Sequence, residues 1–182
     1  MNRLQLNRLK AIFYFWAALL VVASPSSLFA IESIYEAPDI FVSRHFNGEP
    51  PKPSMLYPDQ ALKESIKKVL GGKYSKFRIR YWLKADRSVW ILEEIGKERL
   101  ITSGFSIDAN RISEMKVLIF RESRGWEVRY DSFARQFTDA KLLNDSLKLD
   151  RNIDNISGAT LSVRAVTKLA RLALVLHNSV TS

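Results

Sequence analysis

The stretch FRIRYWL at residues 77–83 alternates apolar and polar side chains, the period of a half-buried β-strand. Three similar runs follow it, SVWILEEI at 88–95, RLITSGFSI at 99–107 and ISEMKVLIF at 112–120. Each connection between these runs has the length of a hairpin loop. Residues 77–120 therefore predict an antiparallel meander.

A helix is predicted just before the meander. Pro58 and Asp59 form a helix start with Asp59 as the N-cap, and Gly71 with Gly72 forms a stop. Between them the apolar residues recur on one face, at Leu62, Ile66, Val69 and Leu70.

A second helix is predicted at the C-terminal end, with Ser162 as its cap. Its apolar stripe has helical spacing and consists of Val163, Val166, Leu169, Ala170, Ala173 and Leu174. The predicted fold class is α+β: a twisted antiparallel sheet of four or five strands, with one helix before it and one C-terminal helix, both covering the sheet.

Length and composition restrict the kind of protein. A chain of 182 residues with 47% hydrophobic residues fits one domain with some additional segments. The absence of cysteine excludes disulfides, thiolate zinc sites and iron–sulfur clusters. With only His45 and His177 as imidazoles, no metal site is expected, and no hydrolytic triad or carboxylate pair is visible that would indicate a catalytic residue.

Residues 1–30 have the order of a secretory signal peptide: basic residues, an apolar run at 11–23, then Pro25 and small residues up to Ala30. Thirteen apolar residues are fewer than the roughly 20 that span a bilayer, which favours cleavage near Ala30 over an uncleaved N-terminal anchor. Cleavage would remove three basic and no acidic residues, lowering the formal charge from +9 to +6. Export argues against a nucleic-acid partner for the basic remainder.

Residues 31–58 are rich in proline and are predicted to form an extended arm, partly held down by aromatic residues such as Phe41, Phe46 and Tyr57. His45 is expected at the surface. The predicted organisation is a signal peptide or anchor at 1–30, the arm at 31–58 and one domain at 59–182.

The stretch DNISGAT at residues 154–160 precedes the predicted C-terminal helix. Small residues at Ser157, Gly158 and Ala159 allow backbone N–H groups to approach a bound group, and the helix start favours an anion. This is a candidate phosphate site, although a tight turn with a helix cap has the same pattern. Either hydroxyl, on Ser157 or Thr160, could contact or carry the phosphate.

This run resembles the flavinylation motif D-x-x-[ST]-G-A-[ST] of the FMN-binding domain family, found in the FMN-carrying subunits of the sodium-pumping quinone reductase and of Rnf complexes. All fixed positions match, and the similarity extends from about Ile101 to about Leu176. The resemblance implies that Thr160 carries FMN through a phosphoester bond, attached by a flavin transferase that uses FAD and magnesium. Asp154, Ser157, Gly158 and Ala159 would serve recognition or fit, and Arg164 would reach the phosphate. Lys168 and Arg171 are expected to be solvated.

In the larger subunits of the family the segment before the flavin site reads roughly E-T-P-G-L-G. Here Glu122 and Gly125 fit that pattern, whereas the proline and the second glycine are absent, so the chain is closer to short, stand-alone members. Trp126 is the expected stacking partner of the isoalloxazine ring, with Trp82, Trp90 and Tyr130 as alternatives. Asp131 and Ser132 are expected to cap a short helix that follows.

The resemblance implies an electron carrier rather than a stand-alone enzyme, located in the periplasm or anchored at the outer face of the cytoplasmic membrane. Its partners would be the flavin transferase and a membrane or periplasmic redox protein. Two alternatives stay open: a module that binds FMN or another phosphate ligand without a covalent bond, and a structural or assembly subunit that kept the fold.

Overall fold

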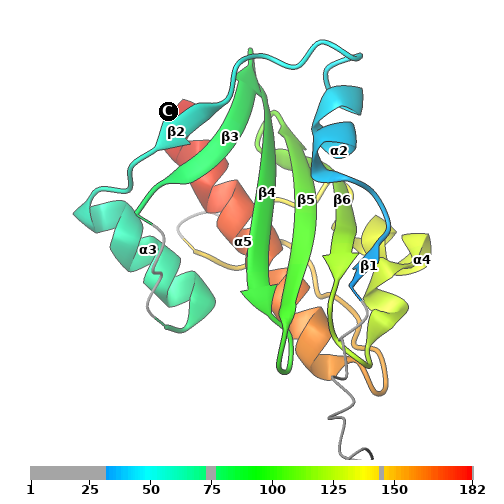
Figure 1. Ribbon diagram of the computed structural model, residues 1–182. Coiled ribbons are helices and arrows are strands. Elements are labelled where there is room, and N and C mark those ends of the chain that lie inside the picture. Colours follow the sequence, from blue (N-terminus) through cyan, green and yellow to red (C-terminus); the bar gives the residue numbers. More distant parts are fainter. Residues whose placement is uncertain (1–31, 73–76, 144–145, 182) are drawn as a thin grey trace, which may run out of the picture.

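The computed structural model describes residues 32–72, 77–143 and 146–181, so the predicted signal peptide at 1–30 lies outside the described residues. These residues form an antiparallel sheet with helices against it (Figure 1). The elements in chain order are β1 (Ser33–Ile34), α2 (Pro38–Arg44), β2 (Ser54–Leu56), α3 (Gln60–Leu70), β3 (Ile79–Lys84), β4 (Arg87–Ile95), β5 (Leu100–Asp108), β6 (Arg111–Phe120), the 3-10 helix η1 (Trp126–Arg129), α4 (Asp131–Ala134), the 3-10 helix η2 (Arg135–Phe137) and α5 (Thr160–Thr181).

The meander predicted from residues 77–120 is confirmed as strands β3 to β6. The sheet order is β1-β6-β5-β4-β3-β2, and all neighbouring strands are antiparallel. The fold class is α+β, as predicted. The sheet has six strands rather than four or five, because β1 and β2 extend its two edges.

The predicted extended arm at 31–58 is wrong in its local structure, since this segment contributes β1, β2 and α2. Pro38 occupies the first turn of α2, where a proline needs no N–H partner. Phe41 and Val42 give the helix an apolar face that docks on the sheet, beside Val89 and Leu118. This burial explains why a segment with so many prolines still contains a helix.

Gly104 provides the space for α2 on this face of the sheet. A Cβ atom at Gly104 would lie 2.6 Å from the ring of Phe41, so only glycine allows the ring to approach so closely. The neighbouring Phe105 points to the opposite face, where it joins the main core.

Charged side chains also tie the segment before β2 to β6. Arg44 donates to Glu36 at 2.8 Å and to Glu114, and Lys116 pairs with Glu36 at 2.8 Å. Burial alone would raise the pKa of Glu36, but the hydrogen bonds from Arg44 and Lys116 outweigh it and hold that pKa below its ordinary value. His45 is not the surface residue expected, because its side chain is only 12% exposed and lies against the ring of Phe41.

Helix α3 confirms the predicted start and stop signals. The side chain of Asp59 accepts a hydrogen bond from the backbone N–H of Leu62 at 2.8 Å, and Gly71 adopts a left-handed conformation with φ of 75°. Its buried residues, Ile66 and Val69, belong to the main core.

Helix α5 covers the face of the sheet opposite α2 and runs diagonally behind the strands in Figure 1. All six residues of the predicted apolar stripe are buried. The predicted cap is wrong: the helix begins at Thr160, and Ser162 is a buried residue of its first turn. Among the described residues, no helix has both the length and the apolar character needed to cross a membrane.

Candidate flavin site

The stretch 154–160 forms a tight turn that leads directly into α5. The N–H of Ala159 donates to the carbonyl of Ile156 at 2.9 Å, and Gly158 has a φ of 82°, a value that favours glycine. The carbonyl of Ala159 accepts from the N–H of Val163 at 2.9 Å, the first bond of the helix. Thr160 therefore lies at the helix start, where backbone N–H groups lack intrahelical acceptors and the helix dipole favours an anion.

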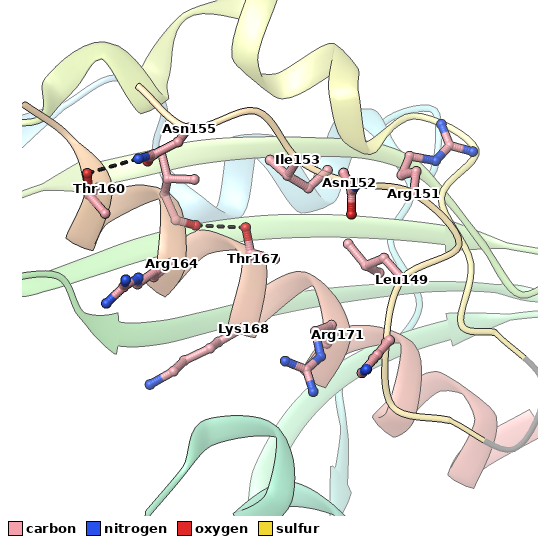
Figure 2. A pocket seen from close by; sticks show the side chains of 12 residues that line it. Leu149, Arg151, Asn152, Ile153, Asn155, Thr160, Arg164, Thr167, Lys168 and Arg171 are labelled. Carbon is pink, nitrogen blue, oxygen red and sulfur yellow. Dashed lines mark hydrogen bonds between the residues drawn. The ribbon is translucent and has the colours of Figure 1, made fainter. Parts of the chain in front are cut away.

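The hydroxyl of Thr160 is held by a neighbour that the sequence did not single out. Nδ2 of Asn155 donates a hydrogen bond to Oγ1 of Thr160 at 3.0 Å (Figure 2). Asn155 occupies one of the two variable positions of the motif, so pattern matching gave no reason to select it. Its bond gives the threonine side chain a defined orientation.

Two cavities, each of about 540 Å³, meet at Thr160. One, which we call the basic cavity, lies between the loop at 148–155 and the side of α5 from Thr160 to Arg171 (Figure 2). The other, the hairpin cavity, is bordered by residues 97–98 of the β4–β5 hairpin, 122–124 after β6, and 158–162 at the start of α5. A group attached to Thr160 would have space on either side.

Glu122 shapes the hairpin cavity. Its Oε1 atom accepts hydrogen bonds from three successive backbone N–H groups of the β4–β5 hairpin, those of Lys97, Glu98 and Arg99, at 2.5, 2.7 and 2.9 Å. A carboxylate that binds three N–H groups fixes the loop around it. This residue, noted for its fit to the family pattern, has a structural role in the described chain.

Gly125 brings the segment after β6 against the start of α5. Its φ is 82°, and a Cβ atom there would lie 2.6 Å from Oγ of Ser162 and 3.4 Å from Cα of Ala159. Trp126 follows as the first residue of η1 and is 45% exposed. Trp126 thus lies beside the motif with an accessible side chain, although it lines neither cavity.

The alternative aromatic residues are less suitably placed. Trp90 is fully buried, stacks on Tyr81 and donates to Oγ of Ser88. Trp82 packs with the cluster beneath α2, on the face of the sheet opposite α5. Tyr130 is exposed and contacts Arg129. The structure therefore favours Trp126 or Tyr130 for contact with a surface ligand, and stacking on FMN stays a prediction.

The other predicted motif residues lie at the surface of the turn. Asp154, Ser157 and Gly158 are exposed, whereas Ala159 is buried beneath the helix start. The backbone N–H of Asp154 donates to Oε1 of Gln136 at 2.7 Å, which ties the turn to η2. Their predicted roles in recognition stay predictions. The short helix α4 does form after Trp126, but neither Asp131 nor Ser132 caps it with a side-chain hydrogen bond.

Three cations of α5 line the basic cavity. Arg164 is exposed and is the nearest of the three to Thr160 along the helix, as expected. Lys168 and Arg171 are half-buried rather than freely solvated. Lys168 lies 3.7 Å from Glu94, and Arg171 donates to the carbonyl of Leu147 while burial lowers its pKa. The prediction that these two are solvated is therefore wrong.

The site thus consists of a turn of small residues at the start of a long helix, with space on both sides of a threonine hydroxyl. Together with the family comparison, this arrangement indicates a flavin-binding module. Residues 96–175 match the model of the FMN-binding domain family. The match agrees with the family that the motif indicated and supports FMN as the cofactor. Comparison with curated proteins and with solved structures gave no match.

The matched region begins in the β4–β5 hairpin, yet the fold begins earlier. Strands β1 to β4 belong to the same sheet, helix α3 joins the main core, and helix α2 packs in the smaller cluster on the opposite face. The family match thus covers β5, β6, the candidate site and most of α5.

Proposed function

We propose that this protein is an exported electron carrier that holds FMN covalently through a phosphoester to Thr160. The observation that carries the proposal is the position of the Thr160 hydroxyl: it lies at the start of a 22-residue helix, between two cavities, inside a domain that matches the FMN-binding family. The exposed Ser157 and Gly158 on the adjoining turn would leave room for an enzyme that modifies the threonine.

The residues present fit an attached FMN phosphate. The helix dipole contributes roughly 0.3–1 kcal/mol to an anion at this position, which is too little to retain a flavin alone. Arg164 can add a charge-assisted hydrogen bond to a phosphate oxygen. The helix dipole and one hydrogen bond from Arg164 would hold FMN only loosely. We therefore favour a covalent link over non-covalent binding.

Attachment requires a flavin donor and a transferase. In the proposed step the Thr160 oxygen forms a bond to the FMN phosphorus of FAD, the bond from that phosphorus to the AMP oxygen breaks, and AMP leaves while the hydroxyl proton is lost. The transferase would supply the magnesium ion. Asn155 orients the hydroxyl, and Asp154 and Ser157 remain accessible for recognition.

The bound flavin would supply the redox chemistry, accepting and passing on electrons singly or in pairs. The protein would hold the phosphate, place the ring near Trp126 and present the cofactor to a membrane or periplasmic redox partner. The leader-like sequence at residues 1–30 supports placement in the periplasm or at the outer face of the cytoplasmic membrane.

Flavin absorbance after denaturation tests the covalent link. Protein coexpressed with a flavin transferase is denatured and passed through a desalting column. Wild-type protein and Ser157→Ala are expected to keep a flavin spectrum, the latter at reduced yield, and Thr160→Ala is expected to lose it. Flavin that separates from denatured wild-type protein would instead indicate a non-covalent FMN module.

Export is tested with a reporter fused after Ser33. The proposal expects activity from a reporter that works only in the periplasm. Activity restricted to a cytoplasmic reporter would contradict it.

A further inference from the structure

The basic cavity has an excess of positive charge that an attached FMN phosphate would only partly neutralise. Its lining includes five cations, Lys148, Arg151, Arg164, Lys168 and Arg171, and no carboxylate. Two of the five are paired with carboxylates outside the lining: Arg151 with Asp150 at 3.1 Å and Lys168 with Glu94 at 3.7 Å. Five cations against two carboxylates leave a net charge of +3, and a phosphodiester at Thr160 would reduce it only to +2.

Two of these cations are fixed in place. Arg151 donates to the carbonyl of Thr138 at 2.8 Å, and Arg171 donates to the carbonyl of Leu147. Figure 2 shows Arg164, Lys168 and Arg171 in a row along α5, with Arg151 on the facing loop. Positive groups that are held by backbone carbonyls lose little side-chain freedom when an anion binds.

The chemistry of the lining favours a carboxylate-bearing partner. Two of its apolar residues, Leu149 and Val163, are only 8% and 5% exposed, so they offer little surface to a lipid chain. The five cations complement carboxylate side chains on a neighbouring protein. The exposed Trp126 and Leu161, which would suit a lipid interface, are not part of its lining.

The cavity also starts at the proposed flavin attachment point. Thr160 belongs to its wall, and the twelve residues from Thr160 to Arg171 span about 16 Å along α5. We propose that the basic cavity is the docking site for a carboxylate-bearing surface of the protein's redox partner, which it brings beside the flavin. This inference rests on the proposed function. Complementary charge at such a site accelerates encounter and fixes orientation.

The test uses the flavinylated full chain and two small electron acceptors of opposite charge. Oxidation of the reduced protein is followed by stopped flow with anionic ferricyanide and with cationic hexaammineruthenium(III). The cavity variant is Lys148→Glu with Lys168→Gln. The control is Lys84→Glu with Lys52→Gln, which changes the net charge equally at exposed lysines outside the cavity.

The proposal expects the cavity variant to react about tenfold more slowly with ferricyanide and faster with the ruthenium complex, within the usual range of steering effects. The control should change either rate by less than about twofold, and added salt should remove the difference. Equal effects of the two variants would overturn the proposal, because net charge alone would then explain them.

Three further measurements separate the possible failures. Intact mass reports whether FMN is attached, so a failed proposed function is recognised before the kinetics. A hexaglutamate peptide titrated into the flavin-free protein should shift the NMR signals of α5 in the wild type and not in the cavity variant; no shift in either would contradict the proposal. If the cavity variant loses only binding to phosphatidylglycerol vesicles, with unchanged ferricyanide rates, the surface binds lipid and the proposal is wrong.

Discussion

Nδ2 of Asn155 lies 3.0 Å from Oγ1 of Thr160 and donates a hydrogen bond to it. The bond closes a five-residue separation across the turn at 156–159 and occupies one lone pair of the hydroxyl oxygen. The hydroxyl proton is left to point away from Asn155, toward whatever accepts it. Asn155 is therefore a positioning residue for the proposed attachment reaction.

Replacing Asn155 by alanine is expected to slow attachment of FMN without unfolding the protein. Loss of one hydrogen bond of ordinary strength, about 0.5–1.5 kcal/mol, corresponds to a rate lower by roughly twofold to tenfold. Mass spectrometry over time, with purified transferase and FAD, measures that rate. Asn152→Ala is the control, since Asn152 lines the same cavity but makes no described contact with Thr160. Equal rates for wild type and Asn155→Ala would refute the positioning role.

Substitution of Gly125 by alanine is expected to destabilise the fold by more than 2 kcal/mol. The left-handed conformation costs about 1 kcal/mol for alanine, and the new Cβ would also lie 2.6 Å from Oγ of Ser162. Gly71→Ala is the matched control, because Gly71 has a φ of 75° and no atom within 4 Å of such a Cβ. Urea unfolding gives the free energies.

Truncation of Ser162 to alanine should rescue part of the Gly125→Ala loss, since it removes the atom in conflict. A double-mutant cycle therefore distinguishes the steric clash from backbone strain. Additive effects of the two substitutions on the free energy of unfolding would show that the clash with Ser162 does not cause the loss of stability in Gly125→Ala.

The sheet and both long helices could be predicted because each has a local signal. Strand alternation gave β3 to β6, Asp59 and Gly71 bounded α3, and the apolar stripe gave α5. Helix α2 had no comparable signal. It forms because Phe41 docks over Gly104, a contact between residues 63 positions apart that no local pattern contains.

The candidate site was predictable only where it too has a local sequence signal. The motif located Thr160 and the turn, and the helix begins three residues before the position that a cap at Ser162 implies. Asn155 and the hairpin-binding role of Glu122 depend on side-chain geometry in the folded chain. The basic cavity was missed because Lys148 and Arg151 come from an irregular loop whose path only the structure shows.

Acid is expected to destabilise the protein through His177. This side chain is almost fully buried, its Nδ1 atom lies 2.7 Å from Oγ of Ser88, and burial lowers its pKa against the weaker opposing effect of Asp108 and Asp86. A lowered folded-state pKa means that the unfolded chain binds the proton first. Stability from this group is therefore full above about pH 6.5, the ordinary value, and falls as the pH drops below it.

The slope below pH 6.5 is at most about 1.4 kcal/mol per pH unit for each histidine that titrates only in the unfolded state. His45 acts in the same direction, since burial lowers its pKa as well. His177→Asn should flatten the pH dependence of the free energy of unfolding while keeping a polar partner for Ser88. An unchanged slope between pH 6.5 and 5 in this variant would show that His177 is not the group that titrates.

The intact mass of the protein after coexpression with a flavin transferase tests the central claim most directly. The wild-type chain is predicted to gain the mass of one FMN less one water, and peptide mapping is predicted to find it on the peptide containing Thr160. Thr160→Ala is predicted to fold, with unchanged unfolding free energy within about 1 kcal/mol, and to gain no mass. A wild-type chain without added mass, or a Thr160→Ala chain that still carries FMN, would contradict the account.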